Sequence, residues 1–172
     1  ALLALVDRNL SHDPGNASVL SLKSSCLACL NRYTEARKCL DNLVQMYPEK
    51  LEFKRERCNI LYNLHEHDAC LANLAELLNV DMHDRSALIL AGKCLMALDR
   101  NEEAVAYFDT VLSLNPDDVE TLLIKANAVI TINRFGEALD AYHRALSIQS
   151  GNVHALTGSG YALLGLYRTD EA

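Results

Sequence analysis

The 172-residue chain is half hydrophobic and carries a formal net charge of −7, so it is long enough to bury an apolar core. This acidic balance argues against nucleic acid and anionic membrane surfaces as partners, because both attract clusters of basic side chains. No apolar run reaches the roughly 18 residues that a membrane span needs. Three prolines and seven glycines are too few for a protein of many short strands, and abundant Leu, Ala and Glu favour helices.

The prolines reveal a period of 34 residues. Pro14, Pro48 and Pro116 are separated by one and two such periods, and proline cannot continue a helix. Other positions repeat in the same phase, without a gap from residue 1 to residue 172. One small-residue column reads Ser24, Cys58, Gly92, Ala126 and Gly160; a second reads Ala36, Cys70, Ala104, Ala138 and Ala172; a large apolar column reads Leu27, Leu61, Leu95, Val129 and Leu163. Self-similarity at this period indicates a solenoid of stacked repeats.

Each period is predicted to contain two helices. Leu88, Leu95 and Leu98 share one helical face, a polar break follows, and Val105 and Phe108 belong to a second apolar stripe. We therefore expect one solenoid domain over 1–172, taken from a longer protein because it does not open with Met. In chain order, residues 1–16 hold the second helix of a partial repeat, full repeats occupy 17–50, 51–84, 85–118 and 119–152, and 153–172 form a partial repeat with a first helix, a turn and the start of a second.

The small columns are expected where the two helices of a pair cross. Small side chains at Gly92 and Ala104 let the backbones approach, and the same column accounts for Gly160. The large residues fill the space between successive pairs, so each repeat depends on its neighbours for burial.

These columns resemble the tetratricopeptide repeat. Its 34-residue pattern has a bulky residue, Leu, Gly and Tyr near the start, followed by Ala, Phe, Ala and Pro. The best agreement, in 85–118, comes from Leu88, Ala91, Gly92, Leu95, Ala104, Phe108, Val111 and Pro116. A departure is the cationic set Lys23, Arg57 and Lys125 where the pattern has Leu, whose stems are expected to lie along the stack. The resemblance implies an all-α, right-handed superhelical solenoid of antiparallel helix pairs, with a concave groove lined by first helices.

The resemblance also places ligand-binding side chains in that groove. The residues expected to form the peptide-binding groove are Arg55, Asn59, Tyr62, Lys93, Met96, Leu123, Asn127, Ile130 and Tyr161. One position per repeat forms a polar ladder of Ser25, Asn59, Lys93, Asn127 and Tyr161. An asparagine carries both donors and an acceptor, so it can pair with a peptide amide. The alternative is that these polar side chains face water and contact no ligand.

A carboxylate clamp, which chaperone-binding members of the family use for acidic tails, is not predicted. Arg55 and Asn59 match its first part. Leu90 then stands where an asparagine is needed, and Glu120 and Ile124 stand where Lys and Arg are needed. Glu120 would repel a bound carboxylate. The mixed groove favours an amphipathic helix or a partly apolar strand instead.

The six cysteines are interpreted as small buried residues. Cys26 and Cys29 are one helical turn apart, but a structural zinc site needs four Cys or His ligands at defined spacing. Cys58 and Cys70 stand in the small columns, where a thiol acts as a small apolar group. We expect no metal, cofactor, disulfide or catalytic group, hence no enzyme, and a cytoplasmic location because the thiols suit a reducing compartment.

Three functions follow from this reading. The leading hypothesis is a protein–protein interaction module, an adaptor or scaffold, that binds a peptide or helix of another protein in the groove. An alternative is a self-assembling scaffold, a homo-oligomer joined through apolar end faces around Leu3, Val6 and Leu10 and around Leu163 and Leu166. A further alternative is a substrate-recruiting arm of a larger enzyme whose catalytic domain lies elsewhere.

Overall fold

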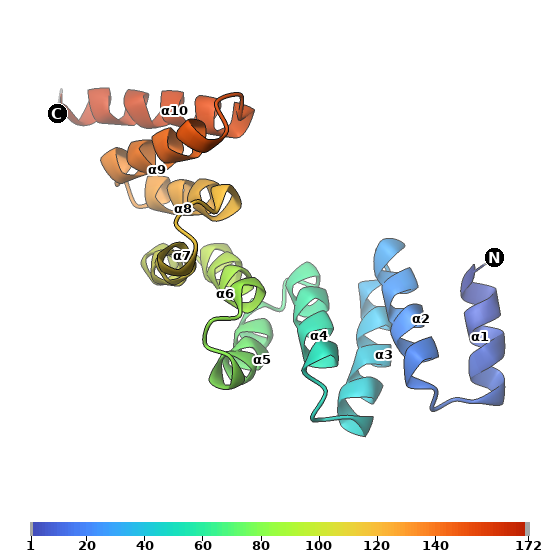
Figure 1. The fold of residues 1–172 in the computed structure, drawn as a ribbon. Coiled ribbons are helices and arrows are strands. Elements are labelled where there is room, and N and C mark those ends of the chain that lie inside the picture. Colours follow the sequence, from blue (N-terminus) through green and yellow to red (C-terminus); the bar gives the residue numbers. More distant parts are fainter. Residues whose placement is uncertain (1, 171–172) are drawn as a thin grey trace. The chain divides into compact units, whose positions relative to one another are not determined.

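The computed structural model describes residues 2–170, with side chains up to Tyr167, and no strand occurs among them (Figure 1). It consists of two compact units, residues 1–80 and 81–172. The first unit holds α1 (Leu2–His12), α2 (Ala17–Cys29), α3 (Tyr33–Met46), α4 (Leu51–Asn63) and α5 (His67–Val80). The second holds α6 (Arg85–Ala97), α7 (Asn101–Leu114), α8 (Val119–Thr131), α9 (Phe135–Ile148) and α10 (Val153–Asp170). Ala172, a member of the second small column, lies outside the described residues.

The all-helical prediction is confirmed. In the first unit α2 packs on α3 and α4 on α5; in the second α6 packs on α7 and α8 on α9, and each pair is joined by a short turn (Figure 1). α1 packs on α2, and α10 packs on α9. The four pairs begin at residues 17, 51, 85 and 119, and we keep the windows 17–50, 51–84, 85–118 and 119–152 as the proposed repeat boundaries.

The turn inside each pair is closed by a residue with a left-handed backbone. These residues, with φ between 56° and 59°, are Asn31, His65, Asp99 and Asn133, each 34 residues from the next. At the first turn the N–H of Arg32 donates to the Leu27 carbonyl, and the N–H of Asn31 donates to the Ala28 carbonyl, both at 2.9 Å. This bonding ends a helix sharply, and Asn and Asp tolerate the left-handed conformation better than most residues.

The turn predicted within 153–172 is wrong for the described residues, because α10 continues without interruption to Asp170. The position that corresponds to Asn133 is Tyr167. An aromatic residue strongly disfavours a left-handed backbone, so the signal that ends the earlier first helices is missing here.

Glycine permits close helix approach at Gly92, Gly158 and Gly165 in the second unit, and at the first two the neighbouring ring is buried. A Cβ added to Gly92 on α6 would clash with the ring of Phe108 on α7, and one added to Gly158 on α10 would clash with Tyr142 on α9. Both rings are buried, so neither can swing away without opening a cavity. The role predicted for Gly92 therefore holds, whereas Gly160 is different: a Cβ there meets no atom within 4 Å.

The outer faces of α1 and α10 differ in burial. Val6 is only 3% exposed, and Leu3 and Leu10 pack against the core of the first unit, so the apolar face predicted to be open on α1 is covered. On α10, Leu163 is 53% exposed. Val129, which holds the same phase on α8, is fully buried because α9 follows it. Among the described residues no helix follows α10, which also explains the open space at Gly160.

Ion pairs join successive helix pairs at a fixed position of the period. Asp7 bonds Lys23 at 2.7 Å, Asp41 bonds Arg57 at 2.6 Å, and Asp109 bonds Lys125 at 2.6 Å. Each links the second helix of one pair to the first helix of the next. The cationic departures from the family pattern thus have carboxylate partners one helix back, and where the cation is replaced by Ala91 the corresponding Asp is replaced by Ala75.

Gly92→Ala is expected to lower the free energy of unfolding by about 1–3 kcal/mol, because the methyl group overpacks the Phe108 ring. Gly160→Ala is the matched control, since it adds the same methyl group to a helix in open space. It is expected to raise stability by up to about 1 kcal/mol through helix propensity. Urea denaturation followed by circular dichroism measures both, and equal shifts of the same sign would contradict the packing argument.

Candidate protein-binding surface

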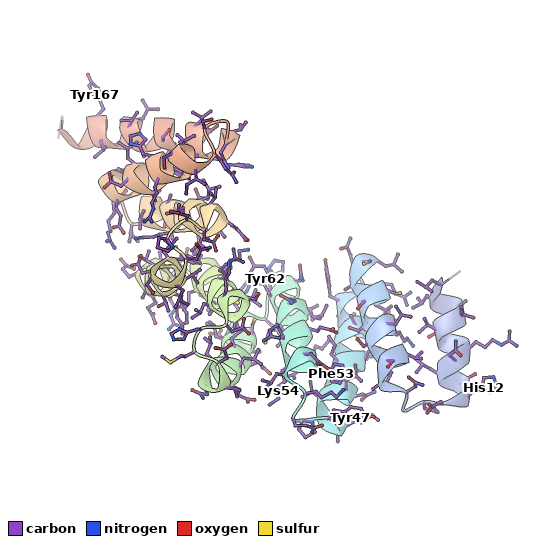
Figure 2. The ribbon with its side chains drawn as sticks, in the orientation of Figure 1. His12, Tyr47, Phe53, Lys54, Tyr62 and Tyr167 are labelled. Atoms are coloured by element: carbon purple, nitrogen blue, oxygen red, sulfur yellow. The ribbon has the colours of Figure 1, made fainter. Side chains whose placement is uncertain are left out.

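The predicted groove residues lie on first helices of both units. Arg55, Asn59 and Tyr62 belong to α4 in the first unit, where Tyr62 lies near the end of the helix (Figure 2). The remaining residues belong to the second unit: Lys93 and Met96 on α6, Leu123, Asn127 and Ile130 on α8, and Tyr161 on α10. Each unit is therefore considered as a surface of its own.

In the second unit, the three ladder positions differ in accessibility. Tyr161 is 61% exposed and Asn127 is also exposed, whereas Lys93 is partly buried. Met96, Leu123 and Ile130 are partly buried, so their side chains contribute to packing as well as to the surface. The face thus combines polar ladder positions with apolar patches.

Asn127 is held by a buried tyrosine. The Tyr142 hydroxyl on α9 donates to Asn127 Oδ1 at 2.7 Å, and Tyr142 is 2% exposed. Burial raises the pKa of the Tyr142 hydroxyl, so it remains a protonated donor at neutral pH. Because the amide oxygen is engaged, the amide nitrogen of Asn127 is the group left for the surface, and no hydrogen bond from it to another described residue occurs.

A charged cluster lies at the start of α6 and α8. Arg85 donates to both carboxylate oxygens of Asp118 at 2.5 and 2.9 Å, and to Glu120 at 2.9 Å. Lys93 lies 3.6 Å from Glu120. The Arg85 guanidinium holds the pKa of Asp118 and that of Glu120 below their usual ranges. Lys93 and Glu120 therefore already neutralise each other, which disfavours a carboxylate ligand at this point.

Asp118 also organises α8 itself. Its carboxylate accepts from the N–H of Thr121 at 3.2 Å, which satisfies one of the free donors at the helix start. The residue is 7% exposed, so its charge depends on Arg85 and on this backbone donor. The cluster is thus a structural element that fixes the beginning of α8, on which Leu123 and Asn127 stand.

In the first unit, Asn59 lies at a small cavity. Residues from α2, α3 and α4 line this cavity of about 210 Å³, which is open to the surface; they are Ser24, Ser25, Ala28, Leu40, Glu56, Asn59 and Ile60. Two predicted ladder residues, Ser25 and Asn59, are therefore brought together across adjacent first helices. Glu56 was missed by the sequence prediction, although its charge interrupts an otherwise apolar column.

Tyr62 occupies the other end of α4. Its ring centroid lies 5.4 Å from that of His67, at an interplanar angle of 60°. Tyr62 is partly buried, so this contact with α5 restricts the ring. Tyr62 therefore lies on the predicted helix, but its ring packs against α5 and is only partly accessible to a ligand.

A second cavity, of about 350 Å³, lies in the second unit on the side of the second helices. It is lined by Asp109, Leu112, Ser113, Leu122, Lys125, Glu137, Asp140, Ala141 and Arg144. Lys125 bonds Asp109 and Glu137 there, at 2.6 and 2.9 Å. Its lining charges are largely paired, so it serves mainly as the site of the ion pair between successive helix pairs.

The chemistry of the remaining groups is simple. None of the six cysteines, all of which lie among the described residues, is in a disulfide, and the Cys70 thiol donates to the Cys58 carbonyl at 3.2 Å inside the first unit. Within the described part of the chain, no three His, Cys, Asp or Glu residues gather closely enough to hold a metal ion. None of the described helices is both long and apolar enough to cross a membrane.

Comparison with known proteins identifies the repeat. Residues 89–153 match the family model of the tetratricopeptide repeat. This segment consists of tetratricopeptide repeats. The predicted family is thereby confirmed for it, and the match includes α7, α8 and α9 with the Asn127–Tyr142 bond.

Solved structures of other tetratricopeptide repeat proteins share the fold. MamA from Desulfovibrio magneticus RS-1 has a TM-score of 0.80 at 14% identity, over 88% of this chain and 85% of that chain. YrrB, a tetratricopeptide repeat protein with an unusual peptide-binding site, has a TM-score of 0.78 at 20% identity, over 92% and 81%. A tetratricopeptide repeat protein from Thermus thermophilus has a TM-score of 0.72 at 20% identity, over 94% and 89%. Among curated protein sequences, none matches the chain significantly.

Asp118→Asn is expected to lower stability by about 1 kcal/mol at neutral pH, since asparagine still caps α8 but loses the charge that Arg85 binds. The pKa of Asp118 is lowered from 3.8 by folding, so its contribution is present above that value and is lost as pH falls through the folded pKa. The stability difference between wild type and variant should therefore shrink below about pH 4. Urea denaturation at several pH values measures it.

The control for this prediction is Asp117→Asn. Asp117 is exposed, and its contact with Arg144 is long, at 3.5 Å. This variant should follow the wild-type stability at every pH, and a loss as large as that of Asp118→Asn would show that general charge, rather than the Arg85 pair, sets the acid sensitivity.

Proposed function

We propose that the chain is a protein-interaction module, an adaptor or scaffold segment, whose first-helix surfaces bind an extended or helical segment of a partner protein. The observation that supports this most directly is the orientation of Asn127. A solvent-exposed asparagine fixed by a buried tyrosine presents its amide nitrogen as a donor in a defined direction. Such preorganisation lowers the entropy lost when a ligand carbonyl is bound.

The support for Asn127 extends through three helices of the second unit. Gly158 on α10 leaves room for the Tyr142 ring on α9, and the Tyr142 hydroxyl reaches Asn127 on α8. At the corresponding positions of the other repeats, the residues in place of Tyr142 are Leu40, Leu74 and Phe108, which carry no hydroxyl. The arrangement is thus specific to one repeat, whereas general packing of the solenoid would not require it.

The surroundings of Asn127 favour a ligand with apolar side chains. Leu123 and Ile130 lie one turn away on the same helix, and Leu164 on α10 is 64% exposed. An amphipathic helix or a partly apolar strand can bury these groups while its backbone or polar side chains pair with Asn127. The peptide-binding site of YrrB supports a peptide ligand by analogy of fold only.

Asn127→Asp is the sharpest test of this proposal. The carboxylate still accepts the Tyr142 hydroxyl, but the amide donor is replaced by an acceptor. Peptides selected on the wild-type chain from a random display library should bind the variant at least about tenfold more weakly, because a ligand carbonyl then faces a carboxylate. Fluorescence polarisation of labelled peptides measures the affinity, and circular dichroism confirms unchanged helicity.

The matched control is Asn42→Ala, because Asn42 is an exposed asparagine on a second helix. It should leave peptide affinity unchanged. Asn59→Ala together with Asn127→Ala should abolish most binding, whereas equal binding by all variants would contradict a first-helix site. Sedimentation of the free chain in the same experiment separates peptide binding from the alternative of self-assembly, in which concentration-dependent association would occur without peptide.

A further inference from the structure

Glu56 is an exception in its column of the repeat. The residues at the same phase in the other repeats are Leu22, Leu90, Ile124 and Gly158. Glu56 lies on α4 and is partly buried. A carboxylate at a half-buried position loses hydration, so it is destabilising there unless a compensating partner is present.

The cavity beside Glu56 is shaped by small side chains. Ser24, Ser25 and Ala28 on α2 leave space opposite Glu56 and Asn59 on α4, and Leu40 and Ile60 provide apolar lining. All of these residues belong to the first unit. With a volume of about 210 Å³, the cavity accepts a single long side chain rather than a helix.

Glu56 has no cationic partner in the part of the chain that the structure describes. Among the residues that the structure describes, no Lys or Arg forms an ion pair with it. Burial, followed by the negative charge of Glu52 one turn earlier, raises the pKa of Glu56, and a hydrogen bond from Ser21 opposes this shift. Glu52 itself contacts Lys50 only at 3.5 Å. The cavity therefore combines the apolar side chains of Ala28, Leu40 and Ile60 with a carboxylate that has a hydrogen bond from Ser21 but no cationic partner among the described residues.

We propose that this cavity receives a lysine or arginine side chain of the bound partner segment, with Glu56 as the group that pairs with its charge. The aliphatic stem would lie against Ala28 and Ile60, and the charged end would reach Glu56. Long cationic side chains combine these two requirements, because their stems are apolar and their ends carry several donors. The inference rests on the proposed function, since it assumes that a partner segment follows the first helices.

The test is a random linear peptide display selection on three immobilised chains: wild type, Glu56→Gln and Glu102→Gln. Glutamine preserves the shape of Glu56 and removes its charge. Glu102 is an exposed acid on α7 and controls for the change in net charge. Peptides enriched on wild type and on Glu102→Gln should share a Lys or Arg at one position, and those enriched on Glu56→Gln should lack this preference.

A double-mutant cycle then assigns the contact. Replacing the shared Lys or Arg of an enriched peptide by Gln should weaken binding to wild type about tenfold or more and change binding to Glu56→Gln little. Peptides that depend on Asn59 but show no cationic preference would overturn this inference and leave the proposed function intact. If no enriched peptide depends on Asn59 or Asn127, both are overturned.

Discussion

A single helix pair of this chain cannot bury its own apolar surface, and the rest of the structure follows from that constraint. Each pair must stack on a neighbour, so the residues between pairs are selected for close contact. Phe108 beside Gly92 shows how tightly this can be done inside a pair. Asp7, Asp41 and Asp109 show how the junction between pairs is reinforced, each reaching a cation on the next first helix. The remaining first-helix surface is then free to vary without loss of the fold.

That freedom is visible when one position is compared between repeats. The ladder position holds Ser25, Asn59, Lys93, Asn127 and Tyr161; Ser25 and Asn59 line one cavity, and the environments of Lys93 and Asn127 differ from it. Asn127 is fixed by Tyr142, Lys93 is drawn towards Glu120, and Asn59 borders a cavity with Glu56. The same position of the repeat therefore supports three local chemistries, and a partner that contacts several repeats meets a different requirement at each.

The sequence was sufficient to predict the helices and their 34-residue spacing, because both depend on local residue patterns that repeat with that period. It was insufficient where a residue departs from the period. The absence of a turn in α10 depends on one residue, Tyr167, which occupies the place of Asn133; this position is not part of the small and apolar columns that define the period. The hydrogen bond between Tyr142 and Asn127 depends on side-chain direction across two helices, which spacing alone does not give. Glu56 could be predicted in part. The sequence shows that a charged residue interrupts an apolar column, but only the structure shows that this residue lines a cavity.

The aspartate–cation pairs between repeats carry a further consequence. Because the acid lies in one repeat and the cation in the next, neither repeat contains a complete interaction. A rearranged chain in which 51–84 was followed directly by 119–152 would place Lys125 against Ala75, so Lys125 would lose the Asp109 pair and keep only its bond to Glu137 within its own repeat. Complementary charges occur at three junctions and are replaced by Ala75 and Ala91 at another, so a repeat is matched to some neighbours better than to others.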